Sequence, residues 1–233
     1  MNSNVTGWCQ ITQNYMKKVI LSLIIGGSVA FFSSCSIEIE TDDKTKEEKT
    51  TVEKCTYSVD DTSVKVEWTS FKFTEKTAVG GTFEMTELDH TTEAKSAAEA
   101  FKNATLSINT RTVNSKESVR DKKIKDSFFG SMDKTDFLTG KIKSLEGIEN
   151  GNGNAIISIT MNGIEKDQNF TWITDEETVE FKTELSIEDW NAKPSLDSLN
   201  TVCADLHTGA DGKSYLWPTV EVKVSANIIK DCK

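Results

Sequence analysis

From Tyr57 onward, the dominant pattern of the chain is an alternation of apolar and polar residues with a period of two. The stretch SVKVEW at 63–68 shows it, and VEVKVS at 220–225 repeats it near the end of the chain. Successive side chains of a strand point to opposite faces, so each stretch predicts a strand with one apolar and one polar face. Shorter stretches with the same alternation occur at 83–85, 106–108, 157–159 and 170–172.

Turn signals separate these stretches, at Gly80-Gly81, 150–154, Asn162-Gly163 and Asp211-Gly212. Asn162-Gly163 is the sharpest and predicts a two-residue hairpin between strands near 154–161 and 164–174. We therefore predict an all-β fold of seven to nine antiparallel strands, either a barrel or a sandwich. The apolar residues of 63–68 fall on even-numbered positions up to Trp68, whereas Phe71 and Phe73 fall on odd-numbered positions. This change predicts a bulge of the kind that barrels use.

Three stretches depart from the strand pattern. Residues 93–101 predict a short alanine-bearing helix, and 187–204, with Pro194 inside it, predicts a loop with a broken helix. Residues 119–129 place six charged side chains in eight positions and end in two phenylalanines. As a helix, this segment has Ile124 and Phe128 one turn apart on one face, which makes a small lid that is charged outside and aromatic beneath.

The first 34 residues have the features of a signal peptide. Lys17-Lys18 precede a largely apolar run of fourteen residues, too short to span a bilayer comfortably, and small residues follow it. Met16 is the expected initiator, since residues 1–15 carry no charge. Cys35 directly after Ser33-Ser34 resembles the lipobox of bacterial lipoproteins, so we expect Cys35 to be lipidated. The alternatives are an ordinary cleaved signal and an uncleaved anchor.

Residues 35–54 are polar and charged without apolar periodicity, as expected for a disordered acidic tether ahead of a domain at 55–233. Without Lys17 and Lys18, 25 basic residues stand against 37 acidic ones, a formal charge of −12. This charge argues against binding nucleic acid and against electrostatic docking on anionic membranes. We therefore expect membrane contact only through the lipid anchor, in the bacterial cell envelope, at the periplasmic or the surface face of the outer membrane.

Three cysteines follow Cys35, in a compartment where disulfides persist. Cys55 precedes the first predicted strand and Cys232 follows the last, so they meet if those strands pair antiparallel. The alternatives are a bridge that involves Cys203, or three unpaired thiols.

Taken in order, four stretches resemble the YceI-like family of secreted bacterial domains. They are YSVDDTSVKVEW at 57–68, VGGTF at 79–83, RDKKI at 120–124 followed by Phe128-Phe129, and WPTVEVKV at 217–224. The resemblance covers roughly 57–231. It implies an antiparallel lipocalin-like β-barrel of about eight strands that binds a long isoprenoid- or quinone-like lipid for storage, transport or stress protection.

The resemblance also implies that 119–129 lies at the mouth of the barrel, with its phenylalanines toward the lipid. The residues that we expect to contact the lipid are Trp68, Phe71, Phe73, Phe83, Ile124, Phe128, Phe129, Met161, Phe170, Trp172 and Phe181. Arg120 either pairs within the protein or meets a head group. Because burying each CH₂ contributes about 0.8 kcal/mol, the sequence predicts binding with little selectivity for the head group.

The same residues bear on two other functions. The chain has two histidines and none of the nucleophile, zinc-protease or phosphate-loop motifs, so we expect neither an enzyme nor a cofactor. Cys203, Asp205 and His207 alternate as part of a metal site would, but a coincidence in a loop is the favoured interpretation and no metal is expected. The second candidate function is a surface-displayed β-sandwich with a filled core that binds glycan or protein. The oligomeric state is left open.

Overall fold

The computed structural model describes residues 54–175 and 177–233. The predicted signal peptide, the lipidation site at Cys35 and the tether up to residue 53 lie outside the described residues. Within them, no helix combines the length and apolar character needed to cross a membrane. The chain order of the strands is β1 (Cys55–Lys72), β2 (Thr77–Phe83), β3 (Thr86–Asp89), β4 (Thr105–Asn109), β5 (Val113–Asn114), β6 (Phe137–Leu145), β7 (Asn152–Met161), β8 (Ile164–Thr174), β9 (Thr178–Ser186) and β10 (Leu216–Cys232).

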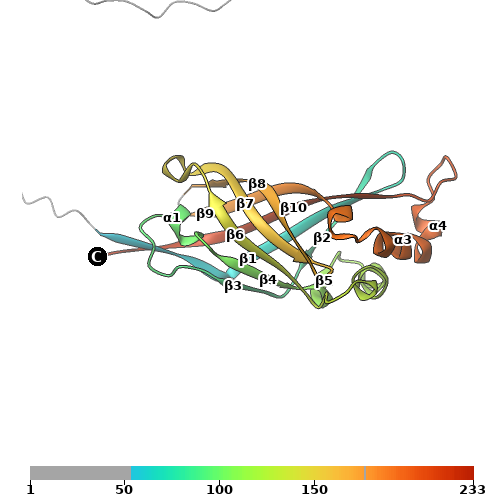
Figure 1. The fold of residues 1–233 in the computed structure, drawn as a ribbon, viewed down its shortest axis with the longest axis horizontal. Coiled ribbons are helices and arrows are strands. Elements are labelled where there is room, and N and C mark those ends of the chain that lie inside the picture. Colours follow the sequence, from blue (N-terminus) through green and yellow to red (C-terminus); the bar gives the residue numbers. More distant parts are fainter. Residues whose placement is uncertain (1–53, 176) are drawn as a thin grey trace, which may run out of the picture. The chain divides into compact units, whose positions relative to one another are not determined.

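All ten strands form one antiparallel sheet, in the order β3-β4-β6-β7-β8-β9-β10-β1-β2-β5. The sheet is curled (Figure 1). Its interior is apolar, because the period-two pattern turns one face of each strand inward. The predicted hairpin between β7 and β8 is confirmed. Asn162 and Gly163 both have positive φ, 52° and 69°, the conformation that a two-residue turn of this type requires. The fold is thus mostly β, as predicted, and consists of a single sheet rather than two packed sheets.

The described residues form ten strands, more than the predicted seven to nine, because two long strands are interrupted. Residues 77–89 divide into β2 and β3, and residues 105–114 divide into β4 and β5 around a short 3₁₀ turn at Thr110–Thr112. Backbone hydrogen bonds continue across the interruption, from Glu84 N to the Thr112 oxygen at 3.1 Å and from Asn109 N to the Met85 oxygen at 3.0 Å. The two ends of the strand order therefore lie beside one another.

β1 and β10 pair over almost their whole length, from Cys55 opposite Cys232 to Lys72 opposite Leu216. The register shifts between Ser70 and Lys72, where the sequence predicted a bulge. The pairing brings Cys55 and Cys232 together in a disulfide and leaves Cys203 as a buried free thiol. Of the alternatives that the sequence left open, the structure thus contains the bridge between Cys55 and Cys232.

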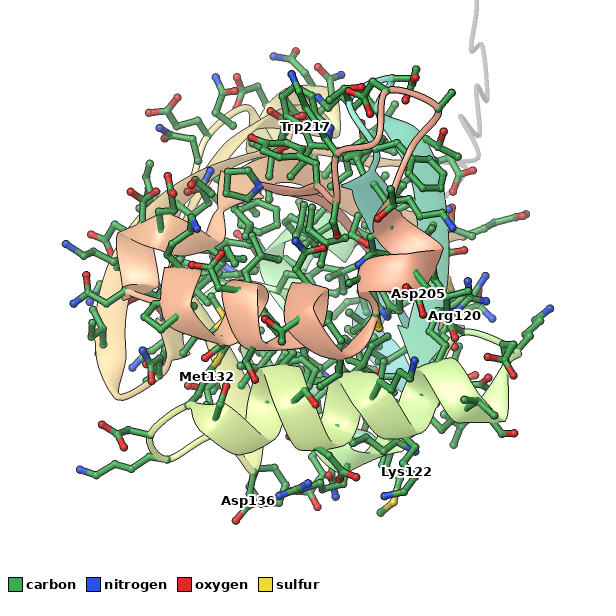
Figure 2. All side chains as sticks on the ribbon, turned by 90° about the vertical axis from the view of Figure 1, so that its right-hand side faces the viewer. Arg120, Lys122, Met132, Asp136, Asp205 and Trp217 are labelled. Carbon is green, nitrogen blue, oxygen red and sulfur yellow. A yellow bond between two sulfur atoms is a disulfide. The ribbon has the colours of Figure 1, made fainter. Side chains whose placement is uncertain are left out.

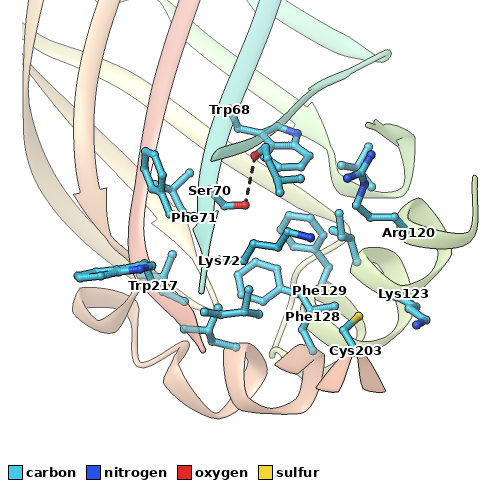
Figure 3. A pocket seen from close by; sticks show the side chains of 18 of the residues that line it. Trp68, Ser70, Phe71, Lys72, Arg120, Lys123, Phe128, Phe129, Cys203 and Trp217 are labelled. Carbon is cyan, nitrogen blue, oxygen red and sulfur yellow. Dashed lines mark hydrogen bonds between the residues drawn. The ribbon is translucent and has the colours of Figure 1, made fainter. Parts of the chain in front are cut away.

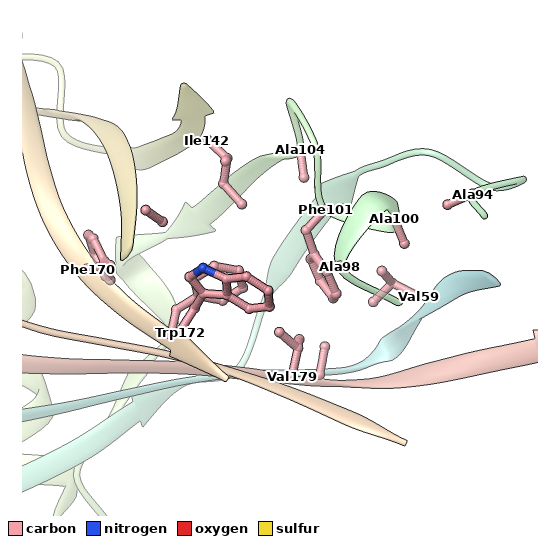
Figure 4. Close-up of a cluster of buried hydrophobic side chains, with 13 residues drawn as sticks. Val59, Ala94, Ala98, Ala100, Phe101, Ala104, Ile142, Phe170, Trp172 and Val179 are labelled. Atoms are coloured by element: carbon pink, nitrogen blue, oxygen red, sulfur yellow. The ribbon is translucent and has the colours of Figure 1, made fainter. Parts of the chain in front are cut away.

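A packed core fills the end of the interior near the disulfide (Figure 4). Helix α1 (Ala97–Ala100) lies inside it, and its N-cap Ser96 accepts a hydrogen bond from Glu99 N at 3.2 Å. The alanines of this helix are small enough to let its backbone approach the sheet. Phe101 packs edge-to-face on Phe181 with ring centroids 5.7 Å apart, and fully burying such a ring stabilises the fold by about 1.5–3 kcal/mol.

Two helical segments lie across the opposite end of the curled sheet, and we call them together the lid (Figure 2). The first consists of α2 (Ser118–Lys123), a π-helical turn η2 (Ile124–Phe128) and a 3₁₀ turn η3 (Phe129–Ser131). The second consists of α3 (Lys193–Val202) and α4 (Ala204–His207), after a 3₁₀ turn at Ile187–Trp190. α3 packs against η2 and η3.

Local sequence explains where the lid helices begin. The Glu117 side chain caps α2 by accepting hydrogen bonds from Val119 N and Arg120 N. Pro194 was predicted to interrupt a helix, but it lies in the first turn of α3, where its missing N–H costs no hydrogen bond. The break predicted within 187–204 falls instead at Asn191, whose φ is 53°.

Candidate functional site

Two adjoining cavities occupy the interior of the sheet between the lid and the packed core. The outer cavity, beneath the lid, has a volume of about 390 Å³, and the inner cavity has about 150 Å³. The outer volume falls in the range of roughly 300–1,000 Å³ that is usual for small-molecule sites. Six residues line both cavities and so mark their junction: Trp68, Phe83, Leu138, Ile159, Leu185 and Val222.

Strand parity explains how β1 lines the outer cavity. Trp68, Ser70 and Lys72 lie two residues apart and all line it (Figure 3), as side chains on one face of a strand do. Phe71 lines it as well, beside the shift in register with β10. The bulge thus adds the ring of Phe71 to a part of the lining that β1 otherwise forms with its even-numbered residues.

The lid contributes the aromatic cover of the outer cavity. Ile124, Phe128 and Phe129 all line it, as the helical interpretation of 119–129 predicted. Phe129 packs edge-to-face on Phe128 at 5.0 Å and on Phe83 of β2 at 6.1 Å between ring centroids. From the second lid segment, Leu196 and Leu199 lie one helical turn apart and line the same cavity.

Polar groups in the lining gather near the lid. Besides Ser70 and Cys203, they are Lys72, Glu117, Arg120, Lys123 and His207. The Lys72 Nζ donates to the Leu206 oxygen at 3.3 Å, and the Lys123 Nζ donates to the Val202 oxygen at 3.0 Å. The inner cavity, by contrast, has no charged residue in its lining. Both cavities are thus lined mainly by apolar groups, and charged side chains reach only the outer one.

Arg120 bonds within the protein, which is one of the two roles predicted for it. Its Nε donates to Ser115 Oγ at 2.8 Å and its Nη2 to the Ser115 backbone oxygen at 3.1 Å. The buried Asp121 accepts a hydrogen bond from Ser115 N at 2.7 Å. These bonds position the guanidinium at the wall of the cavity, which Arg120 also lines.

His207 is half-buried at the same end of the outer cavity. Burial, followed by the charges of Lys72 and Lys123, lowers the pKa of His207 from 6.5 to about 4. The ring is therefore neutral at pH 7, and its Nδ1 lies 3.1 Å from Asn200 Oδ1. A neutral imidazole with Nδ1 as donor leaves Nε2 as an acceptor.

Trp68 is the aromatic residue at the junction of the cavities. Its indole Nε1 is buried without a hydrogen-bond partner, whereas the indole nitrogens of Trp172, Trp190 and Trp217 each donate to a backbone oxygen. Its ring lies over Gly81, where an added Cβ would come within 2.6 Å of Trp68 Cζ2. Only glycine at this position leaves room for the indole.

The structure brings most of the predicted lipid-contacting residues together. Trp68, Phe71, Phe83, Ile124, Phe128, Phe129 and Met161 line the outer cavity, and Phe170 and Phe181 line the inner one, together with Phe83 and Trp68 at the junction. Trp172 stacks on Phe181 at 6.3 Å in the packed core and lines neither cavity.

Phe73 lies in the turn after β1 and lines neither cavity, so its place among the lipid contacts is corrected. Its φ is 62°, and its backbone oxygen accepts the Trp217 indole N–H at 2.8 Å. The chain has left the strand at this point, and period-two parity no longer predicts where a side chain points.

Sequence reasoning missed several residues of the lining. Lys72 has the same even parity as Trp68, and this signal was available in the sequence. The contributions of Leu196, Leu199 and His207 depend on the packing of α3 and α4 over the sheet, which the sequence pattern does not indicate.

The described residues contain no cluster of three or more His, Cys, Asp or Glu side chains able to hold a metal ion. Cys203, Asp205 and His207, which alternate along the sequence, do not lie in a loop. They lie instead at and within the short helix α4, with Cys203 buried and Asp205 exposed.

The fold and its interior define a class of small antiparallel β proteins that enclose an apolar cavity beneath a helical lid. The YceI-like domain model matches residues 57–228, well over half of the chain, and the chain belongs to this family. No curated protein gives a significant match.

Solved structures share the fold. A polyisoprenoid binding domain from Saccharophagus degradans is similar with a TM-score of 0.54 at 15% identity, over 74% of this chain and 97% of that chain. BcnA from Burkholderia cenocepacia is similar with a TM-score of 0.53 at 14% identity, over 74% of this chain and 99% of that chain. At such identities the likeness concerns the fold alone.

Proposed function

We propose that this protein binds one long apolar lipid of the isoprenoid or quinone type inside its curled, lipocalin-like sheet. The observation that carries the proposal is the pair of adjoining cavities that share six apolar lining residues. Apolar cavities of this kind exclude water and accept apolar ligands. The name of the similar domain from Saccharophagus degradans, a polyisoprenoid binding domain, supports the same ligand class.

Burial of the lipid tail supplies the affinity. Each CH₂ removed from water contributes about 0.8 kcal/mol, so even ten such groups offset a large part of the cost of ordering the ligand. Nine of the eleven residues expected to contact the lipid line the two cavities. The protein acts in this proposal as a carrier or store and not as an enzyme.

We further propose that Cys35 anchors the protein by a lipid to the outer membrane of a bacterial envelope. The support lies in the sequence, in the apolar run before Ser33-Ser34-Cys35. Incorporation of labelled palmitate into the wild-type protein and not into a Cys35→Ser variant tests this anchor independently of the cavity.

Native mass spectrometry tests the proposed ligand. The whole mature chain carrying Cys35→Ser is exported to the periplasm and purified without detergent. We expect a bound species of several hundred daltons that extracts into organic solvent. A bare polypeptide mass that stays unchanged after incubation with long-chain quinones and isoprenoid alcohols would overturn the proposal and favour a surface module that binds glycan or protein.

A further inference from the structure

Three cationic side chains line the outer cavity beside the lid: Lys72 from β1, and Arg120 and Lys123 from α2 (Figure 3). The sequence as a whole is strongly acidic, with 37 acidic residues against 27 basic ones. Among the residues that the structure describes, no carboxylate forms an ion pair with any of these three groups within 4.0 Å. These three cations thus have no direct ion-pair partner in the described part of the chain; Asp121 reaches Arg120 only through Ser115, whose Oγ donates to the carboxylate and accepts from Arg120 Nε.

These cations keep free hydrogen-bond donors. An ammonium group has three donors, and Lys72 and Lys123 each use one on a carbonyl of the second lid segment. The guanidinium of Arg120 has five, of which two bond Ser115. The one carboxylate in this lining, Glu117, accepts from the backbone N–H groups of Val119 and Arg120 at the start of α2.

The two lysines lower the pKa of a neighbouring side chain, His207. After burial, the charges of Lys72 and Lys123 are the causes that hold the pKa of His207 near 4. The same field stabilises a negative charge placed beside them.

We infer that the lipid carries an anionic head group, a carboxylate or a phosphate, which lies at the lid between Lys72, Lys123 and Arg120 while the tail passes Trp68 into the inner cavity. The inference rests on the proposed function and deepens it. It also replaces the sequence-based expectation of little head-group selectivity, because hydrogen bonds to charged groups are stronger than neutral ones.

Matched ligands test the inference on the mature chain carrying Cys35→Ser. Geranylgeranyl phosphate is compared with geranylgeraniol, and palmitate with hexadecanol, by titration of tryptophan fluorescence. We expect each anion to bind at least about tenfold more tightly than its alcohol at low ionic strength, with a smaller difference at high salt. The variant Lys72→Gln, Lys123→Gln should lose most of this preference and still bind the alcohols, whereas Lys72→Arg, Lys123→Arg should retain it.

The control variant is Lys122→Gln, Lys143→Gln, which removes the same charge from exposed positions outside the lining. It should leave the preference intact. A second readout is the NMR titration of His207, whose pKa should rise when the phosphate lipid binds and stay unchanged with the alcohol. This readout follows the charge at the site and does not depend on the affinity of the tail.

The outcomes separate the two claims. If alcohols bind as tightly as anions and the double lysine variant changes nothing, the anionic head group is refuted while the proposed function stands. If no lipid binds, the proposed function fails as well. If inorganic phosphate alone shifts His207 as far as the lipid does, the site binds free anions and the inference is overturned.

Discussion

The Lys72 ammonium on β1 donates a hydrogen bond to the Leu206 carbonyl on α4, 3.3 Å away and 134 residues later in the chain. Lys123 makes the equivalent bond from α2 to the Val202 carbonyl at the end of α3. The two bonds attach the second lid segment to the sheet and to the first lid segment. Both are exposed, and we expect each to contribute about 1 kcal/mol to lid closure.

Replacing Lys72 with Met should therefore increase lid opening about fivefold. Cys203 lies in the second lid segment, between α3 and α4, with its side chain buried, and its rate of alkylation reports this opening. The rate is measured in the mature chain carrying Cys35→Ser, in which the other two cysteines form the disulfide. Lys122→Met serves as the control, and equal rates in all three proteins would contradict this role of Lys72.

Gly140 should determine how long a lipid tail the interior accepts. It lines the inner cavity, and an added Cβ would meet only the Ile157 side chain at 3.5 Å, an ordinary contact. Gly140→Leu should fill the inner cavity without strain and exclude three or four CH₂ groups of a long tail. We expect a loss of about 2–3 kcal/mol in binding a 20-carbon isoprenoid, since each CH₂ contributes about 0.8 kcal/mol. Calorimetry should show no loss for a 10-carbon analogue or for Gly140→Ala; equal losses for both chain lengths would refute the assignment.

His207 should make the folded state less stable in mild acid. Its pKa is about 4 when folded, mainly because of burial, and returns to the usual 6.5 on unfolding. Between these values the unfolded chain binds a proton that the folded protein does not, so stability falls as the pH drops from 6.5 to 4 and is unaffected above 6.5. Because the ring is half-exposed, solvent screening reduces the effect, and we expect about 1 kcal/mol. Urea unfolding at pH 7.5 and 4.5 measures it, and His207→Gln should remove this part of the pH dependence.

The disulfide should stabilise the fold by closing a loop between residues 177 positions apart. Cys55→Ser should lower the free energy of unfolding by about 2–4 kcal/mol, since the unfolded chain regains the freedom that the bridge removes. Urea unfolding with and without reductant checks this. Reductant should destabilise Cys203→Ser as much as wild type and should not affect Cys55→Ser. No change on reduction of the wild type would contradict the prediction.

The strands and one turn were predictable because their signals are local. The alternation at 63–68 and the Asn162-Gly163 pair each depend on a few neighbouring residues, and both structures formed as expected. The interruption of the strand at 84–85 was not predictable, because it depends on hydrogen bonds to residues 109–112.

The candidate site was predictable in its aromatic part and, among its cations, only at Arg120. Phe128 and Phe129 end a charged helical segment in which Ile124 and Phe128 lie one turn apart, and both line the outer cavity. Phe73 does not line the cavities, because its own φ is positive and the backbone has left the strand there. Lys72 was not predicted to line the cavity because an inward position of a strand usually holds an apolar residue. Its role depends on the Leu206 carbonyl of the lid, which is distant in the sequence.

The sequence by itself determined that this chain forms an antiparallel sheet with an apolar face, because side-chain alternation acts through the local geometry of a strand. It also placed the cysteines at the two strands that pair. Only the tertiary structure decided that the interior is hollow and that its charged end lies under α3 and α4. Cavity volume and the grouping of Lys72, Arg120 and Lys123 depend on how distant segments pack, and packing between distant segments leaves no periodic signal in the chain.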